Sequence, residues 1–158
     1  MATSPKLPCR LRHIACGALL ALAGCAQSVQ TAQAPAGPIP AGQARIWFYR
    51  DYEPSVSRNF ANIDLNGARV LSISPSGGVI YRDVPPGHYH IAPESVGVDI
   101  NQAKDIDLAP GQEAFAKLLA DNSWVSGGDQ TDFHRDTFYI SLMPPDVARA
   151  QMAVARPI

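Results

Sequence analysis

Residues 44–50 read Ala-Arg-Ile-Trp-Phe-Tyr-Arg and carry the strongest strand signal in the chain. Bulky aliphatic and aromatic side chains favour β-structure, and successive side chains of a strand point to opposite faces. Ile46 and Phe48 therefore share one face of this strand. Trp47 and Tyr49 share the other face. Because both faces are apolar, we expect a central or well-covered strand.

Charged residues stand at the two ends of the same stretch. Arg45 lies near its start, and Arg50 is followed closely by Asp51 and Glu53. Arginine and carboxylate side chains are mostly exposed in folded proteins. We therefore expect Arg45 and Arg50 to be solvated charges at the strand ends.

The rest of the chain consists largely of short β-prone segments separated by turn residues. The expected strands are residues 62–65, 69–74, 79–84, 88–91 and 137–142, with 96–100 and 106–108 as shorter candidates. Periodicity alone does not assign residues 113–120 to helix or strand, and the short strands before them favour a strand. Asn66-Gly67 predicts a type I′ hairpin, because both turn positions need positive φ. Residues 147–154 predict a short helix with Asp146 as its N-cap. The fold class expected from this pattern is all-β, an antiparallel β-sandwich with a short C-terminal helix.

The N-terminus has the pattern of a secretory signal. Basic residues precede an apolar run at residues 14–23, and small residues lead up to Cys25. A membrane-spanning helix needs about 20 apolar residues, roughly twice what this run supplies. The alternative is an ordinary signal peptide that happens to contain a cysteine.

The tetrad Leu22-Ala23-Gly24-Cys25 resembles the lipobox of bacterial lipoproteins. The resemblance implies cleavage between Gly24 and Cys25, a diacylglyceryl thioether on the Cys25 sulfur and acylation of the freed amine. Ala26 is not the aspartate that retains many lipoproteins at the inner membrane. By resemblance to that sorting pattern, we expect a cell-envelope protein at the outer membrane that faces the periplasm, with the membrane as a partner through its lipid.

Composition divides the chain into three parts. We expect residues 1–24 to be a lipoprotein signal peptide, residues 25–43 a lipidated cysteine with a flexible tether, and residues 44–158 the β-sandwich domain. The tether has no charge and little apolar bulk. Without the leader the charge is (13 − 3) − 14 = −4, with no basic run, which argues against nucleic acid as a partner. Cys25 would be the only remaining cysteine, so no disulfide is expected within a monomer.

The opening strand at 44–50, the segment Ile63–Gly67 and the corner Val84-Pro85-Pro86-Gly87-His88-Tyr89 together resemble a known group of proteins. The chain looks like small bacterial lipoproteins built on an uncharacterised domain of unknown function. That group resembles PEGA-type modules, whose sandwich is related to transthyretin-like or carbohydrate-binding-like folds. The resemblance implies a fold and an envelope setting, and it carries no established activity or catalytic residues.

His88 and His90 are the clearest candidates for metal ligands. They lie two residues apart on an expected strand, so both imidazoles should share a face. This spacing can chelate Zn²⁺ or Cu²⁺ if a third ligand arrives, such as His134 or Asp136. The alternative is two polar side chains on the solvent-facing side of a strand.

Residues 121–136 are polar and contain glycine, and we expect a long loop that carries Trp124. Trp124 with Asn122 could bind a glycan, because an aromatic face offers apolar area beside hydrogen-bonding groups. The alternative is that Trp124 anchors the loop in the core. The loop acids Asp129, Asp132 and Asp136 lack the ligand spacing of an EF-hand, so we expect solvated acids there.

The sequence gives little support to catalysis. It contains no Gly-x-Ser-x-Gly motif and no glycine-rich phosphate loop that opens a helix. We therefore expect no enzyme and no cofactor. The expected role is a binding or scaffolding module for an envelope protein or the cell wall, with an exposed sheet edge or the 121–136 loop as its contact surface. The alternative is a small-ligand module that binds glycan or metal.

Overall fold

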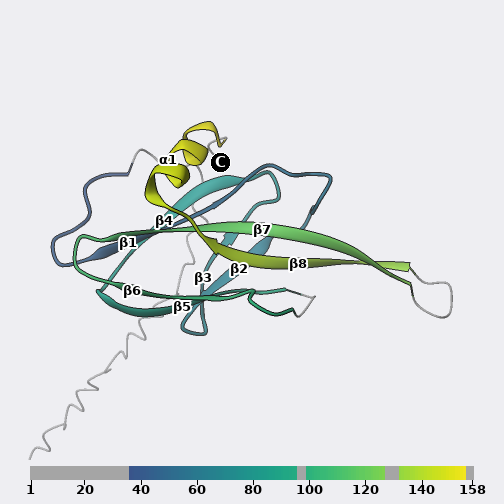
Figure 1. Ribbon diagram of the computed structural model, residues 1–158, viewed down its shortest axis with the longest axis horizontal. Helices are drawn as coiled ribbons and strands as arrows, with labels where there is room; N and C mark the ends of the chain where they lie inside the picture. The colour runs from purple at the N-terminus through teal and green to yellow at the C-terminus, as the bar shows by residue number, and fades with distance from the viewer. Residues whose placement is uncertain (1–35, 96–98, 127–131, 156–158) are drawn as a thin grey trace, which may run out of the picture.

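The computed structural model describes residues 36–95, 99–126 and 132–155, and for 123–126 and 132–135 it describes the backbone. Two four-stranded sheets pack face to face. One sheet has the order β4-β1-β7-β8, formed by β4 (Gly78–Val84), β1 (Ala44–Arg50), β7 (Glu113–Ser126) and β8 (Asp132–Leu142). The other has the order β3-β2-β5-β6, formed by β3 (Ala68–Ile73), β2 (Ala61–Leu65), β5 (Gly87–Pro93) and β6 (Lys104–Leu108). One helix, α1 (Pro145–Val154), follows β8 (Figure 1).

The predicted all-β sandwich with a short C-terminal helix is confirmed. Neighbouring strands pair antiparallel in both sheets, with one exception. β1 and β7 pair parallel, from Arg45↔Glu113 to Tyr49↔Lys117. The predicted leader and Cys25 lie outside the described residues.

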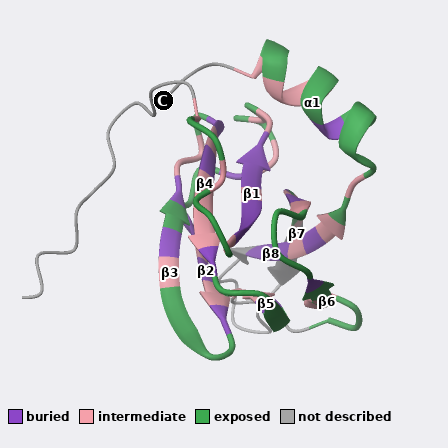
Figure 2. Cartoon of the chain, turned by 90° about the vertical axis from the view of Figure 1, so that its left-hand side faces the viewer, coloured by how far each residue is buried: buried purple, intermediate pink, exposed green. Residues whose placement is uncertain are grey.

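β1 is covered on both faces, as its sequence predicts. Ile46 and Phe48 are fully buried in the core between the two sheets, where they join residues such as Ile63 and Ile140. On the outer face, Tyr49 packs in a second apolar cluster beneath α1. Figure 2 shows β1 as one of the most continuously buried strands.

The helix holds the outer cluster in place. Its Ala148 is fully buried against Tyr49 and Phe115. The Tyr49 hydroxyl donates a hydrogen bond to Oε1 of Gln151 in α1, at 2.8 Å. Burial, with Asp51 nearby, raises the pKa of Tyr49 to about 12. Tyr49 therefore stays a neutral hydrogen-bond donor at physiological pH.

Arg45 is not a solvated charge, and that prediction is wrong. The residue is 3% exposed. Nε and Nη2 donate to the two carboxylate oxygens of Asp83, directly opposite on β4, at 2.6 and 2.9 Å. The guanidinium also lies 4.1 Å from the ring centroid of Tyr81. The hydrogen bond with Asp83 raises the pKa of Arg45. A strand partner and an aromatic ring, both distant in sequence, therefore bury it.

Residues 121–136 do not form the predicted long loop. β7 continues to Ser126 and β8 begins at Asp132, with pairing through Ser126↔Asp132. Residues 127–131 lie outside the described part. Backbone pairing carries the hairpin into a polar stretch that has no apolar alternation to signal strands.

Smaller expectations have mixed outcomes. Asn66 and Gly67 both have positive φ, 51° and 80°, as predicted for their hairpin. Residues 96–98 of the candidate strand at 96–100 are outside the described residues, and Ile100 lies in a turn. The helix is confirmed, but its N-cap is Pro144, and Asp146 lies in the first turn. No helix among the described residues is long and apolar enough to span a membrane.

Gly77 provides a test of the packing at the end of β1. It has a φ of +83°, and a Cβ there would lie 2.8 Å from the Arg50 carbonyl oxygen. Gly111 has a similar φ of +76° but open space around it. We predict that Gly77→Ala costs about 2–4 kcal/mol of unfolding free energy, because steric overlap adds to backbone strain. Gly111→Ala should cost about 1 kcal/mol. Urea unfolding measures both, and equal losses would contradict the tight packing.

Candidate functional site

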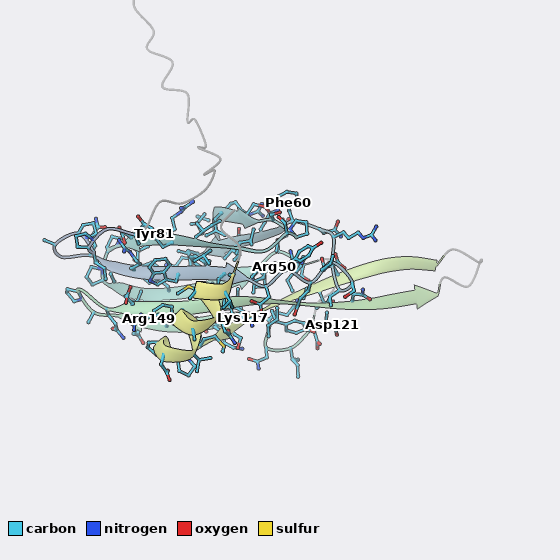
Figure 3. All side chains as sticks on the ribbon, turned by 90° about the horizontal axis from the view of Figure 1, so that it is seen from above. Arg50, Phe60, Tyr81, Lys117, Asp121 and Arg149 are labelled. Atoms are coloured by element: carbon cyan, nitrogen blue, oxygen red, sulfur yellow. The ribbon has the colours of Figure 1, made fainter. Side chains whose placement is uncertain are left out.

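Two connections and one hairpin meet at the same end of the sandwich. The connections are residues 51–60, between β1 and β2, and residues 94–103, between β5 and β6. The hairpin is β7–β8, which continues past Lys117, the last residue of β7 paired with β1. We call residues 121–126 and 132–137 the arm, and the arm with both connections the distal end. Figures 1 and 3 show the arm extending away from the rest of the molecule.

Asp136 fastens the 51–60 connection to the base of the arm. Its side chain lies on β8 and is 3% exposed. Oδ2 accepts hydrogen bonds from Oγ of Ser57 at 2.7 Å and from Nδ2 of Asn59 at 2.6 Å. The carboxylate predicted to be a solvated loop acid or a metal ligand is therefore a buried structural acceptor. Sequence reasoning missed this role because Ser57 and Asn59 are almost eighty residues away along the chain.

The 94–103 connection covers the outer edge of β8. The Phe138 amide donates to Oγ of Ser95 at 2.9 Å, and its carbonyl accepts from Nε2 of Gln102 at 3.0 Å. The Ile140 amide donates to the Gln102 carbonyl at 2.8 Å. These bonds satisfy backbone groups that an edge strand would otherwise present to another chain.

Arg50 is buried beneath the 51–60 connection, so the prediction of a solvated charge is wrong here too. The residue is 1% exposed. Nη1 donates to the Asn59 carbonyl at 2.9 Å, whereas Nε and Nη2 are buried without a hydrogen-bond partner. The guanidinium carbon lies 5.4 Å from the ring centroid of Phe138. Desolvation lowers the pKa of Arg50, and the charge of Asp136 opposes that shift.

The sequence does contain a signal that Arg50 is buried. Arg50 is in phase with Ile46 and Phe48, which lie four and two residues before it on the inward face of β1. The period-two pattern therefore places Arg50 between the sheets. Residue-type statistics alone pointed the other way.

Asn122 also fastens the 51–60 connection. Its Nδ2 donates to the Val56 carbonyl at 2.7 Å, with the Ser55 carbonyl at 3.4 Å. The predicted ligand-binding amide thus holds backbone in this structure. Trp124 lies opposite His134 in the pairing of β7 with β8, and both side chains are outside the described part. Glycan binding by Trp124 and its alternative, anchoring in the core, both stay predictions.

The distal connections expose large apolar side chains. Tyr52 and Phe60 are 54% and 64% exposed at the two ends of the 51–60 connection. Ile100 is 85% exposed in the 94–103 connection. Hydrogen bonds hold backbone beside two of them: the Asn59 carbonyl accepts from Nη1 of Arg50, and the Ile100 amide donates to Oδ1 of Asp99. Exposed aromatic side chains such as these are available for contact with a partner.

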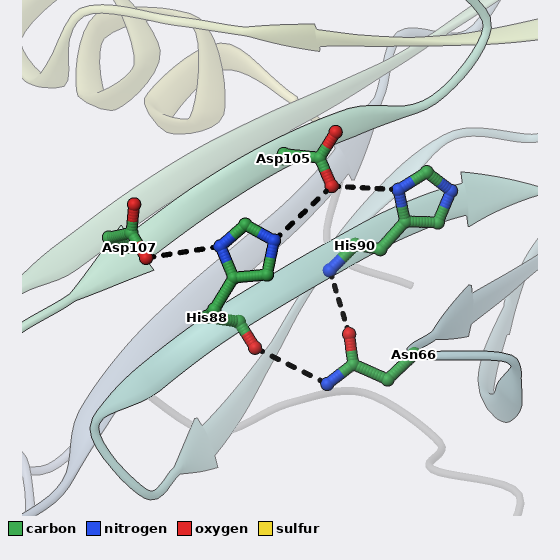
Figure 4. A network of polar contacts seen from close by, with 5 residues as sticks. All are labelled: Asn66, His88, His90, Asp105 and Asp107. Carbon is green, nitrogen blue, oxygen red and sulfur yellow. Dashed lines mark hydrogen bonds and ion pairs between the residues drawn. The ribbon is translucent and has the colours of Figure 1, made fainter.

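His88 and His90 lie elsewhere, on the solvent-facing side of β5 (Figure 4). Nδ1 of His88 is 3.0 Å from Oδ1 of Asp107, and its Nε2 is 3.5 Å from Oδ1 of Asp105. Nδ1 of His90 is 2.8 Å from the same Asp105 oxygen. The hydrogen bond from His90 lowers the pKa of Asp105.

This arrangement gives the imidazoles carboxylate partners on β6. The ligand predicted from β8, Asp136, bonds to Ser57 and Asn59 instead. The His134 side chain is outside the described part. Among the residues that the structure describes, no three His, Cys, Asp or Glu side chains are arranged to hold a metal ion. Metal binding by His88 and His90 therefore remains a prediction without support from this geometry.

No protein-family model matches the chain, and no curated protein matches its sequence. The similarity to PEGA-type lipoproteins thus stays a prediction, and the role of the protein must be argued from its own surfaces.

The fastening role of Asp136 can be tested by substitution. We predict that Asp136→Ala lowers the unfolding free energy by about 3 kcal/mol or more, because it leaves the buried Ser57 hydroxyl and the Asn59 amide without their acceptor and removes a carboxylate whose charge favours ionised Arg50. Asp121→Ala, at an exposed position of the same arm, should change it by less than about 0.5 kcal/mol. Urea denaturation compares the two variants, and a similar small loss in both would show that Asp136 fastens nothing.

Proposed function

We propose that the protein is a lipid-anchored module of the cell envelope that binds or scaffolds an envelope partner through its distal end. The observation that carries this proposal is that the chain enters the domain at one end and the arm extends from the other. Residues 36–43 enter at the start of β1, where Nη1 of Arg45 donates to the Gly37 carbonyl at 2.7 Å. β7 runs parallel to β1 and continues into the arm. The attachment and the arm therefore lie at opposite ends of the domain.

This placement of the attachment and the arm at opposite ends suits a tethered recognition module. The hydrogen bond from Arg45 docks Gly37 on the domain, so the free tether would run from Cys25 to Gly37, 37 − 25 = 12 residues. A linker of that length spans roughly 19 Å on average. Acyl chains on Cys25 would hold the start of β1 near the membrane. The distal end would then point away from the membrane.

The chemistry of the distal end favours recognition over catalysis. Asp136 and Asn122 use their side chains to hold the 51–60 connection. The exposed Tyr52, Phe60 and Ile100 supply apolar area, and aromatic residues are enriched at binding surfaces. In the arm, β7 continues past Lys117, the last of its residues that pairs with β1. Backbone groups of the arm can pair with an extended segment of a partner. The domain can thus bind without changing its fold.

The partner would be a periplasmic or outer-membrane protein, or cell-wall glycan as the second class. A glycan is the second candidate because exposed Tyr52 and Phe60 offer aromatic faces for sugar rings. In either case the outer membrane is the expected location, with the domain facing the periplasm.

A pull-down from native membranes tests this proposal with matched hairpin variants. In the arm-shortened variant, Asn-Gly replaces residues 123–135 between the register partners Asn122 and Asp136. This keeps both residues that fasten the 51–60 connection. In the control, Asn-Gly replaces residues 127–131 between Ser126 and Asp132, so the arm remains.

We expect wild type and control to capture the same protein or wall fragment. The arm-shortened variant should capture it at least about tenfold less, the loss of roughly one strong contact. Cys25→Ser should lose capture from membranes while keeping binding to a solubilised partner. Equal capture by the arm-shortened variant would refute recognition through the arm. Equal capture from intact membranes by Cys25→Ser would refute the anchored role.

A further inference from the structure

The solvent-facing side of the β5–β6 pair carries a square of titratable groups. His88 and His90 on β5 stand directly opposite Asp107 and Asp105 on β6 in the strand register. All four side chains are at least half exposed. β6 is an edge strand of its sheet and has β5 as its neighbour on one side. The side-chain contacts across this pair therefore add to the backbone pairing that holds β6 in the sheet.

His88 bridges the two carboxylates. One ring nitrogen faces Asp107 at 3.0 Å and the other faces Asp105 at 3.5 Å. A neutral imidazole carries one N–H, whereas the imidazolium ion carries two. An ionised carboxylate only accepts hydrogen bonds. His88 can therefore donate toward both carboxylates only when it is protonated.

The other side of β5 is held by bonds that do not titrate. Asn66, in the β2–β3 turn, donates from Nδ2 to the His88 carbonyl at 3.3 Å. Oδ1 of Asn66 accepts from the backbone amide of His90 at 2.8 Å, and the backbone amide of Asn66 donates to the His90 carbonyl at 2.9 Å. β5 is thus fixed to the turn at any pH (Figure 4), and protonation of the imidazoles acts on β6.

Other charged groups of this sheet have partners of their own. Arg69 on β3 pairs with Asp64 on β2 and with Glu94 after β5. Lys104, at the start of β6, donates to Asn101. None of these side-chain types changes charge between pH 5 and 8 at its ordinary pKa, whereas histidine does.

The acidic limit of the effect comes from the carboxylates. The hydrogen bond from His90 lowers the pKa of Asp105. A lowered carboxyl pKa contributes stability above the ordinary carboxyl range, and this contribution is lost as the pH falls through the lowered value. Histidine is the side-chain type that gains its charge in mildly acidic solution, where carboxylates are still ionised. The contacts are therefore strongest in mildly acidic solution.

We propose that His88, His90, Asp105 and Asp107 form an acid-strengthened clasp on the edge strand β6. In mildly acidic solution His88 donates to Asp107 and forms an ion pair with Asp105, and His90 donates to Asp105. At neutral pH His88 loses its ion pair with Asp105 and β6 opens more often. Residues 94–103 lead directly into β6, and Gln102 covers the edge of β8. If the distal end binds a partner as proposed above, this opening loosens part of that surface, but the clasp itself does not depend on that function.

Amide hydrogen exchange on the full chain tests the clasp at about pH 5.5 and pH 7.5, with rates corrected for intrinsic exchange. We expect the β6 amides to be about threefold more protected at the acidic pH, as for an exposed ion pair. The amides of β3, the opposite edge of the same sheet, should show equal protection at both values. Equal protection of β6 at the two pH values overturns the proposal.

Two substitutions assign the effect to the clasp. His88→Gln keeps a hydrogen-bonding side chain that does not titrate, and it should remove more than half of the pH dependence of β6. His134→Gln, which changes a histidine on β8, should leave that dependence intact. If His88→Gln keeps the full dependence, or if His134→Gln removes it, the clasp is refuted. Partner capture is not needed for this readout, so failure of the clasp and failure of the proposed function are distinguishable.

Discussion

The need to cover both faces of β1 governs the architecture. Ile46 and Phe48 require a second sheet on one side, and Trp47 and Tyr49 require a cover on the other. The sandwich core meets the first requirement, and α1 returning over the outer face of the sheet meets the second. Burying large apolar side chains is the main stabilising contribution available, since the described chain relies on no disulfide. A β-strand with one polar face would have needed neither the helix nor the outer cluster.

The central position of β1 also sets the direction of the molecule. β7 pairs parallel to β1, so the long β7–β8 hairpin leaves the sandwich at the end opposite the entry of the chain. Each end of β1 carries a buried arginine with a different environment. Arg45 is matched by Asp83 and holds Gly37, whereas Arg50 lies between the sheets under a connection fastened by Asp136. In the proposed role, one end serves attachment and the other serves contact with a partner.

Much of the fold follows from the sequence, because alternation and turn chemistry act locally. The strand at 44–50, the Asn66-Gly67 turn and the C-terminal helix are examples. Other features depend on which strands become neighbours. The burial of Arg45 needs Asp83 opposite it, the role of Asp136 needs Ser57 and Asn59 nearby, and the His–Asp square needs the β5–β6 register. The arm was missed because backbone pairing, without an apolar pattern, extends it.

The proposed role depends most on anchoring through Cys25, and the intact mass of the protein purified from its native membranes tests this most directly. We predict a chain that begins at Cys25 and carries the added mass of a diacylglyceryl group and an amide-linked acyl chain. A chain that retains residues 1–24, or one that begins elsewhere and carries no lipid, would contradict the anchored module. The protein would then not be held at the membrane by a lipid, and its distal end would have to bind partners without that anchor.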